Sequence, residues 1–466
     1  MGAPVNLWIT WVNAQKKCAT TSESDMVREI YLLGTEHLTG NSSWWGHWAS
    51  FEAQNGNIGS INDMYTARWV FDQGCEQNGC DPHLWLKWAR FERNLGNNGD
   101  FEKKYTARWI FKEGCSRDAH NPHLWLEWID LECQIGNYGD INSLYTARWI
   151  AKEGCARTAS THLWIKRAEI EIATKNIGDI ACEGSARWIL YTGANKYPKA
   201  SNIWIKWAEL EEIVGNVGDY ETENSAAWIY QTACTQNGIV SDAAIWLKWV
   251  DFATNNNSTM HCARVDDFTP SKILKIACID HNIPNSQAWM KWATTEEVLG
   301  NIGNYSISYS AAWIHKEACM RNVDDDEQIW VAWAYFIERN KEHSNLLSDY
   351  PPDVVLRNKC LSGTKDVSPW IAWAVVEEAK DNIGDYSTEY SAAWLYQESC
   401  VNQNSTENST CWLKWARFAH KNPLHNEHGE LINAEYVLEY AQRTCPAFNN
   451  QLWIDLANFK KEIGYQ

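Results

Sequence analysis

The sequence predicts an all-α fold: a right-handed α-solenoid of about eleven and a half helical hairpins, each about forty residues long. Three observations support this prediction. Pairs of Trp three residues apart recur along the chain, with 37 to 43 residues between successive first members. A further Trp recurs in the second half of seven repeats, and a Gly- and Asn-rich segment lies between the two halves.

The Trp pairs define the first half of each repeat. In the segment that begins at Leu84, Trp85, Trp88, Phe91 and Glu92 are spaced to lie on one face of a helix, called here an A helix. Two repeats keep only the first Trp, at Trp164 and Trp453. The complete pairs are Trp8/Trp11, Trp45/Trp48, Trp85/Trp88, Trp125/Trp128, Trp204/Trp207, Trp246/Trp249, Trp289/Trp292, Trp330/Trp333, Trp370/Trp373 and Trp412/Trp415.

The second Trp series defines the other half, a B helix. It occurs in segments such as Tyr-Thr-Ala-Arg-Trp-Ile, which begins at Tyr105. The two series and Trp44 account for all 30 Trp, so the Trp excess is the repeat itself and leaves no separate aromatic site to explain. The second series is Trp69, Trp109, Trp149, Trp188, Trp228, Trp313 and Trp394. As the structural core of the repeats we predict Trp85, Trp88, Trp109, Trp125, Trp128, Trp149, Trp204, Trp207 and Trp228.

The two helices are separated by a Gly-Asn-x-Gly-Asp motif, at residues 96–100, 136–140 and 215–219. Gly and Asn tolerate the left-handed backbone that ends a helix, and Asp is a good N-cap. We therefore expect a tight turn, with the Asp capping the B helix.

One hairpin cannot bury both of its faces, so neighbouring hairpins must stack. We expect a single solenoid over residues 1–466, with a C-terminal cap at 451–464. Residues 254–271 and 337–353 replace the usual motif and form possible irregular joints. They are either hinges or docking loops for a partner, or insertions that the surface tolerates.

The composition bears on which partners and which location the protein can have. The chain has 41 Lys and Arg against 59 Asp and Glu, a net charge of −18, which favours basic partners and disfavours nonspecific binding to nucleic-acid phosphates. We expect no membrane span, because no 18-residue apolar stretch occurs, and no signal peptide.

The cysteines do not predict a disulfide framework. The chain has 15 Cys, and nine of them close a B helix once per repeat. They are interpreted as small buried hydrophobes, which favours a reducing compartment. The nine are Cys75, Cys115, Cys155, Cys234, Cys278, Cys319, Cys360, Cys400 and Cys445.

Glu and Arg also recur once per repeat. Such pairs could be catalytic, but their recurrence favours structural pairs that lock each hairpin, represented by Glu92, Arg108, Glu132 and Arg148. His83, His123 and His162 precede a first Trp by two residues and are interpreted as exposed helix starts, not ligands. No Cys and His cluster has zinc-ligand spacing, and no glycine loop carries the residues of a P-loop. We therefore expect no catalytic, cofactor or metal site.

These motifs together resemble half-a-tetratricopeptide (HAT) repeats, which are found in crooked-neck-like splicing scaffolds and other RNA-processing factors. The family has Trp, a second aromatic residue and Glu on helix A, and Ala-Arg before a large apolar residue on helix B. Here the second aromatic is Trp instead of Tyr, and Ala227, Ala312 and Ala393 replace the Arg. The resemblance covers the whole chain. It implies a scaffold that binds protein partners on its concave face within an RNA-processing assembly, with indirect RNA contact possible and a nuclear or other intracellular location.

A secreted protein is the alternative. The Trp-x-x-Trp spacing is also a C-mannosylation motif, and glycosylation sequons occur at Asn41, Asn257, Asn304, Asn404 and Asn408. On this interpretation the protein is an extracellular, glycosylated structural protein that self-associates.

Overall fold

A computed structural model describes residues 5–18, 24–38, 40–78, 81–235, 242–256, 268–323, 326–363, 366–401, 409–426 and 428–444, and single positions 454, 458, 459 and 461. The chain divides into two compact units, Met1–Asn216 and Val217–Gln466, called here the N-terminal and C-terminal units. Within the described residues both units are built from helices, and the strands form one short hairpin.

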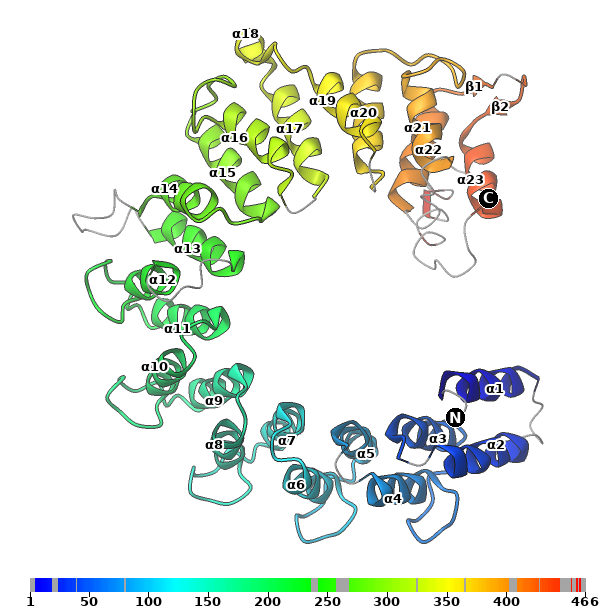
Figure 1. The fold of residues 1–466 in the computed structure, drawn as a ribbon, viewed down its shortest axis with the longest axis vertical. Coiled ribbons are helices and arrows are strands. Elements are labelled where there is room, and N and C mark those ends of the chain that lie inside the picture. Colours follow the sequence, from blue (N-terminus) through cyan, green and yellow to red (C-terminus); the bar gives the residue numbers. More distant parts are fainter. Residues whose placement is uncertain are drawn as a thin grey trace. The chain divides into compact units, whose positions relative to one another are not determined.

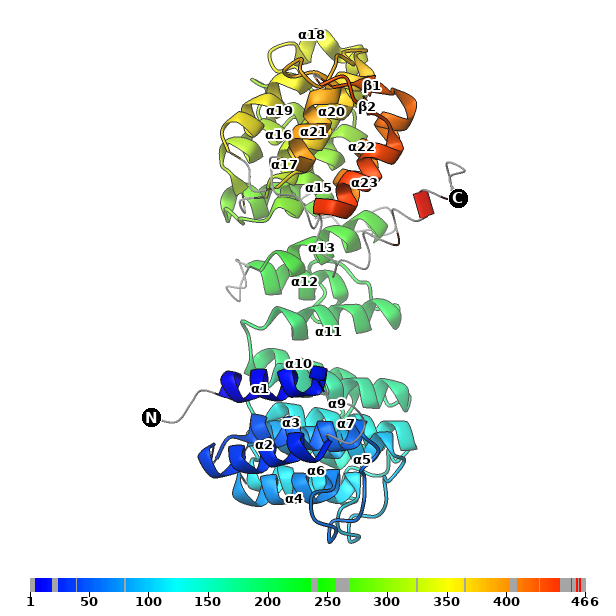
Figure 2. The ribbon, with the colours of Figure 1, turned by 90° about the vertical axis from the view of Figure 1, so that its right-hand side faces the viewer.

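A and B helices alternate along the N-terminal unit (Figure 1). The A helices lie on the inner side of its curve and the B helices on the outer side, and the helices run side by side (Figure 2). The A helices are α1 (Val5–Cys18), α3 (Ser42–Gln54), α5 (Pro82–Asn94), α7 (Pro122–Ile135), α9 (Thr161–Ala173) and α11 (Ser201–Ile213). The B helices are α2 (Ser24–His37), α4 (Ala67–Gln77), α6 (Ala107–Arg117), α8 (Ala147–Arg157) and α10 (Ala186–Lys196).

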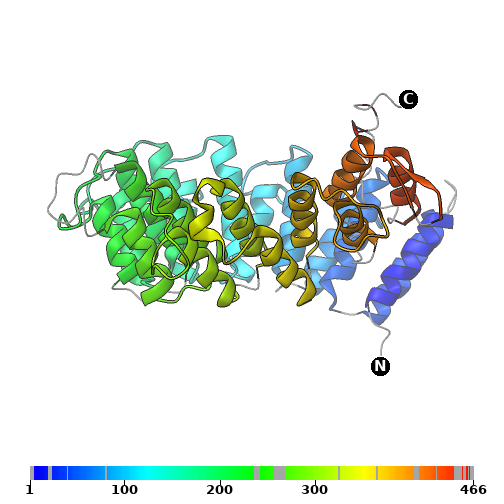
Figure 3. The same cartoon turned by 90° about the horizontal axis from the view of Figure 1, so that it is seen from above.

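The C-terminal unit continues the alternation, and its consecutive helices also pack side by side (Figure 3). A π-helical turn, Ile276–Asp280, extends α14, and β1 (Leu424–His425) pairs antiparallel with β2 (Leu431–Ile432). Its A helices are α13 (Ala243–Asn256), α15 (Ser286–Val298), α17 (Gln328–Arg339), α20 (Ser368–Ala379) and α22 (Ser409–Lys421). Its B helices are α12 (Ala226–Thr235), α14 (Pro270–Lys275), α16 (Ala311–Met320), α19 (Pro352–Leu361), α21 (Ala392–Val401) and α23 (Ala434–Thr444). The predicted all-α fold of repeated helical hairpins is confirmed.

The predicted tight turn between the two helices is wrong. Helix α5 ends at Asn94 and α6 begins at Ala107, so an ordered loop joins them. The N-cap of α6 is Thr106 and not Asp100, because the Thr106 side chain accepts the Trp109 amide hydrogen bond at 3.3 Å. Thr146 caps α8 in the same way. The Gly-Asn-x-Gly-Asp motif therefore begins a loop and does not start the next helix.

The loop is held by its own polar groups. Asn97 Nδ2 donates to the Tyr105 carbonyl at 3.0 Å, and the Ala107 amide donates to the Asn97 carbonyl at 3.0 Å. At Gly99 the backbone φ is +55°, and a Cβ there would lie 2.1 Å from Thr106 Cγ2. Gly is required at this position both for its backbone conformation and for the close approach of the capping residue.

Residues 337–353, predicted as an irregular joint, contain short helical elements. After α17 the chain forms a 3-10 turn, Lys341–His343, and the short helix α18 (Ser344–Leu347), before Pro352 starts α19. Of the other predicted joint, residues 257–267 lie outside the described part of the chain, as does most of the expected cap at 451–464.

Candidate protein-interaction surface

The Trp pair of α5 fills the space between consecutive hairpins. Trp85 and Trp88 are 3% and 1% exposed, and their ring centroids lie 5.9 Å apart. The Trp88 ring stacks on Phe71 of the preceding B helix, with centroids 6.2 Å apart, and also contacts Tyr105 of its own hairpin. The same residue therefore buries surface on both sides. Four other predicted core residues of the A helices are also buried: Trp125, Trp128, Trp204 and Trp207.

The Trp of the B helices occupies a different environment. Trp109 meets Trp88 edge-on, with ring centroids 6.5 Å apart, and packs edge-on against Tyr105 at 5.4 Å. It is only half-buried, and so are Trp149 and Trp228. These three predicted core residues are therefore less buried than the Trp pairs of α5 and α7.

The recurring Arg and Glu connect neighbouring hairpins. Arg108 on α6 forms a two-point ion pair with Glu132 on α7, with Nε–Oε1 at 2.9 Å and Nη2–Oε2 at 2.7 Å. The expected pairing within one hairpin is wrong: Glu92 binds Arg68 of the preceding hairpin, at 2.8 Å. The Glu side chains are fully buried, and the Arg side chains are 25% and 17% exposed. Each pair therefore joins one hairpin to the next.

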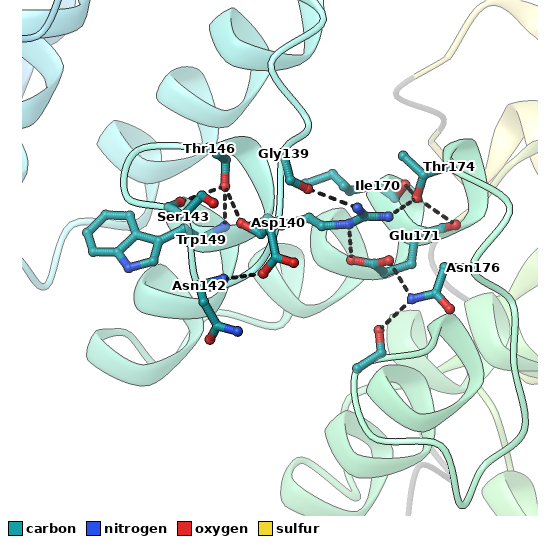
Figure 4. A network of polar contacts seen from close by, with 12 residues as sticks. Gly139, Asp140, Asn142, Ser143, Thr146, Trp149, Ile170, Glu171, Thr174 and Asn176 are labelled. Carbon is teal, nitrogen blue, oxygen red and sulfur yellow. Dashed lines mark hydrogen bonds and ion pairs between the residues drawn. The ribbon is translucent and has the colours of Figure 1, made fainter.

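Further hydrogen bonds surround three of these pairs, and Figure 4 shows those at Glu171. Arg148 donates to Glu171 Oε1 at 2.9 Å and to the Gly139 carbonyl at 2.9 Å. Asn176 Nδ2 donates to Glu171 Oε2 at 2.8 Å. One buried carboxylate thus holds the Arg of the preceding hairpin and the loop of its own.

Sequence reasoning missed this role of the Asn. Asn97, Asn137 and Asn176 each stand five residues after the buried Glu and donate to it. The constant Glu-to-Asn spacing was the available signal. The first ion pair, Arg28 with Glu52 at 2.9 Å, was also not predicted from the sequence, because α2 lacks the Ala-Arg-Trp motif.

The A helices present polar side chains on the inner side of the N-terminal unit, called here the inner face. On α5 the exposed residues include His83, Lys87 and Arg90, while the Trp pair is buried. Arg90 pairs with Glu127 of the next A helix at 2.7 Å. The same kind of ion pair recurs along the inner face. Further pairs are Lys166 with Asp130 at 2.6 Å and Lys206 with Glu169 at 3.4 Å.

A small basic cluster lies at the start of the inner face. Lys16 of α1 and Lys87 of α5 both lower the pKa of His47 on α3, after desolvation by burial, which is the larger cause. Lys16 also lies over the Phe51 ring, with its Nζ 4.8 Å from the centroid. This positive cluster stands out in a chain with a net charge of −18.

The three His residues that precede a Trp are exposed at the first turns of their helices. Among the described residues no group of three or more His, Cys, Asp or Glu is arranged to hold a metal ion. Over the same residues, no helix is both long and apolar enough to cross a bilayer.

Two cavities lie within the C-terminal unit. One, of about 380 Å³, is at residues 337–352, lined by Ile337, Leu347, Pro351 and Pro352, among others. The other, of about 230 Å³, lies between α21, α22, α23 and the β-hairpin.

The cysteines divide into two groups. Cys75, Cys115 and Cys155 are buried and free, and burial raises the pKa of each thiol, which makes them poor nucleophiles. Cys234, Cys278, Cys319 and Cys360 are also buried and free. Cys400 departs from this pattern: it forms a disulfide with Cys411, so its interpretation as a plain buried hydrophobe is wrong. Cys445 lies outside the described residues.

Two of the predicted sequon residues lie in the described part of the chain. Asn41 caps α3, and its side chain accepts from the Trp44 amide at 3.1 Å. The Asn304 side chain accepts from the amides of Ser306 and Ile307. Asn257, Asn404 and Asn408 lie outside the described residues.

Comparisons with known proteins add little to the structure. No family model and no curated protein sequence matches the chain. Among solved structures, the crystal structure of yeast Tom70 aligns over 99% of this chain and 89% of its own, with 12% identity and a TM-score of 0.31. Because that TM-score is low, the fold is assigned from the helical hairpins themselves.

Proposed function

We propose that this protein is a non-catalytic scaffold that binds protein partners along the inner face of its A helices. The observation that carries the proposal is that buried residues of an A helix hold the stack while other residues of the same helix are exposed. On α3 and α5 the Trp pair and Glu are buried and hold the stack, while three positions spaced three or four residues apart are exposed and differ between the two helices. On α3 these positions are Ser43, His47 and Ser50, and on α5 they are His83, Lys87 and Arg90.

A surface of this kind suits recognition by many weak contacts. The hairpins repeat the same backbone geometry, so the partner meets a series of regularly spaced side chains whose chemistry differs from repeat to repeat. The ion pairs between neighbouring A helices order these side chains before a partner arrives, which lowers the entropy cost of binding.

We further propose that the hairpins are HAT repeats and that the partners belong to an RNA-processing assembly. This rests on the resemblance of the Trp, Glu and Ala-Arg positions to that family. The excess of acidic residues favours indirect contact with RNA, through a bound protein. A nuclear or other intracellular location follows from the same proposal.

The scaffold proposal is tested by affinity capture with the full chain and two charge-reversal variants. Lys87→Glu changes the inner face, and Lys152→Glu makes the same change on the outer helix α8, where Lys152 is exposed. Captured partners should be reduced severalfold by Lys87→Glu and unchanged by Lys152→Glu. Equal recovery with both variants would refute the inner face as the binding surface. Absence of splicing or ribosome-maturation factors among the captured proteins, with and without ribonuclease, would refute the RNA-processing assignment alone.

A second candidate is a secreted, glycosylated protein that self-associates. The specific observation in its favour is the Cys400–Cys411 disulfide, because such bonds persist mainly in oxidising compartments. The sequons at Asn404 and Asn408 lie between these two cysteines. Intact-mass and peptide mass spectrometry of the native protein decides between the candidates. Glycans on these Asn, or hexose on Trp, would support secretion, whereas unmodified peptides with free Cys400 and Cys411 would exclude it.

A further inference from the structure

The cavity of about 230 Å³ in the C-terminal unit is lined by polar side chains together with three tyrosines and a tryptophan. Tyr386 and Trp415 are buried members of this lining, and Trp415 Nε1 donates to the Tyr386 hydroxyl at 3.4 Å. Tyr436 and Tyr440 of α23 form a half-buried wall, with ring centroids 6.2 Å apart. Glu430 lies at the exposed rim, where Asn426 Nδ2 donates to its Oε2 at 2.9 Å.

Elsewhere in the protein, in four places, the tyrosine two residues before the start of a B helix is covered by a cation from the preceding hairpin. Before α23 the same position is Ile432, so Tyr436 and Tyr440 are additional rings of this region. The cation comes from the B-helix position three residues before the recurring Cys. Lys275 lies 4.0 Å from the Tyr309 ring centroid, and Arg357 lies 4.7 Å from that of Tyr390. The other two examples are Lys112 over Tyr145 at 5.0 Å and Lys316 over Tyr350 at 5.4 Å. Each cation fills space against a ring and gains from its electron-rich face.

At the cavity the corresponding residue is not a cation, as is also the case at Asp72 and Gln231. The position three residues before Cys400 is Gln397, which aligns with Lys316 in the segments Ala-Ala-Trp-Leu-Tyr-Gln and Ala-Ala-Trp-Ile-His-Lys. Gln397 lines the cavity, and its Oε1 is buried with no hydrogen-bond partner among the described residues. A buried carbonyl oxygen without a donor is costly, so this atom points to a ligand that donates.

We propose that this cavity binds an organic cation, the guanidinium or ammonium end of a basic side chain or a small free ammonium ion. The cation would take the place that Lys112, Lys275, Lys316 and Arg357 have in four other hairpins, with its charge against Tyr436 and Tyr440. Gln397 Oε1 and the Glu430 carboxylate accept its hydrogen bonds or balance its charge.

The surroundings select for positive charge. Among the described residues, the lining includes no Lys or Arg, and its acidic member is Glu430. Aromatic faces with a nearby carboxylate are the usual means of holding alkylated ammonium groups and guanidinium groups. Only the peptide-borne source rests on the proposed scaffold function, because a free cation would bind without any partner.

The test is calorimetric titration of the full chain with three probes: N-acetyl-arginine methylamide, N-acetyl-lysine methylamide with a free side-chain amine, and tetramethylammonium. The citrulline analogue of the arginine probe, which is neutral and nearly isosteric, is the ligand control. Saturable millimolar binding of a cation, about tenfold stronger than citrulline, is the expected result. If only the amino-acid probes bind, the source of the cation is a basic side chain. If only tetramethylammonium binds, the source is a free ammonium ion.

Gln397→Lys is the decisive variant, because it introduces at this position the Lys that α6, α14 and α16 carry. It should fold with an unchanged or higher midpoint of thermal unfolding and bind the cation at least about tenfold more weakly. Glu430→Gln should weaken binding severalfold. Glu439→Gln, an exposed carboxylate of α23 outside the cavity, should leave it unchanged.

The inference fails if citrulline binds as well as arginine, if Gln397→Lys binds like the wild type, or if no probe binds saturably. None of these results affects the scaffold proposal, which is tested by Lys87→Glu on the N-terminal unit.

Discussion

The ion pair between Arg108 and Glu132 gives the sharpest test of how the hairpins hold together. The perturbation is Arg108→Ala. Glu132 is fully buried, and Arg108 supplies two of its hydrogen bonds, at 2.9 and 2.7 Å. After the substitution, Asn137 Nδ2 at 2.6 Å remains as its side-chain partner among the described residues. A buried carboxylate is left partly uncompensated in the seam between α6 and α7.

The expected cost is about 3 kcal/mol, the lower part of the range for removing one partner of a buried pair. The lower part applies because Arg108 is 17% exposed and water can reach the vacated space. The matched control is Arg117→Ala on the same helix. Arg117 pairs with Glu113 at 3.0 Å, but the two side chains are 41% and 31% exposed, so the loss should stay below about 0.5 kcal/mol.

The assay is amide hydrogen exchange resolved by helix. Repeat proteins open locally, so one global free energy of unfolding does not describe them. A cost of about 3 kcal/mol raises the local opening constant about a hundredfold. That increase should centre on α6 and α7, the helices that the pair connects.

The double variant Arg108→Met, Glu132→Gln checks the cause. It removes the buried charge as well as its partner, so it should recover part of the lost protection. If Arg108→Ala costs no more than Arg117→Ala, or if protection falls evenly along the whole chain, the assigned role of the pair is refuted.

Three further predictions concern the core, the loop and a buried His. Trp125→Ala should cost about 3–5 kcal/mol and release exchange protection first in α7 and its neighbours; equal loss in distant helices would contradict nearest-neighbour stacking. Gly139→Ala should lower the thermal midpoint more than Gly136→Ala, because its Cβ would lie 2.2 Å from Thr146 Cγ2 whereas Gly136 faces open space; equal shifts would contradict the close approach. Burial lowers the pKa of His315 to about 3, with Glu297 opposing the shift and Arg339 adding to it. Below pH 6.5 the unfolded state therefore binds more protons than the folded state, and stability should fall by up to about 1.4 kcal/mol per pH unit. His315→Phe should flatten that dependence between pH 6.5 and 5 in urea unfolding, and matching pH profiles would contradict the prediction.

Local patterns predicted much of the fold. The three-residue spacing of Trp85 and Trp88 places both indoles on one helix face, and the recurrence of this pair requires stacked hairpins. A burial pattern of this kind depends only on helix geometry and hydrophobicity, so it can be read from residues close together in sequence. The B helix was located by the same means, from the segment that begins at Tyr105.

The candidate site was less predictable. Arg108 and Glu132 stand 24 residues apart, and sequence alone does not tell whether Arg108 binds the Glu before it or the one after it. The cavity beside Gln397 was not foreseen, because it depends on a β-hairpin that interrupts the repeat between α22 and α23. The Cys400–Cys411 disulfide was also missed, because the pattern of one Cys per B helix does not include Cys411.

By itself, the sequence determined the helical hairpins and their repeat, because hydrophobic periodicity acts within a few turns of one helix. Tertiary structure decided which charged partners meet, how deeply Trp109 is buried, and where Gln397 leaves an aromatic cavity open. These outcomes depend on distances between separate helices, and a one-residue difference in a loop changes such distances without altering the periodicity of either helix.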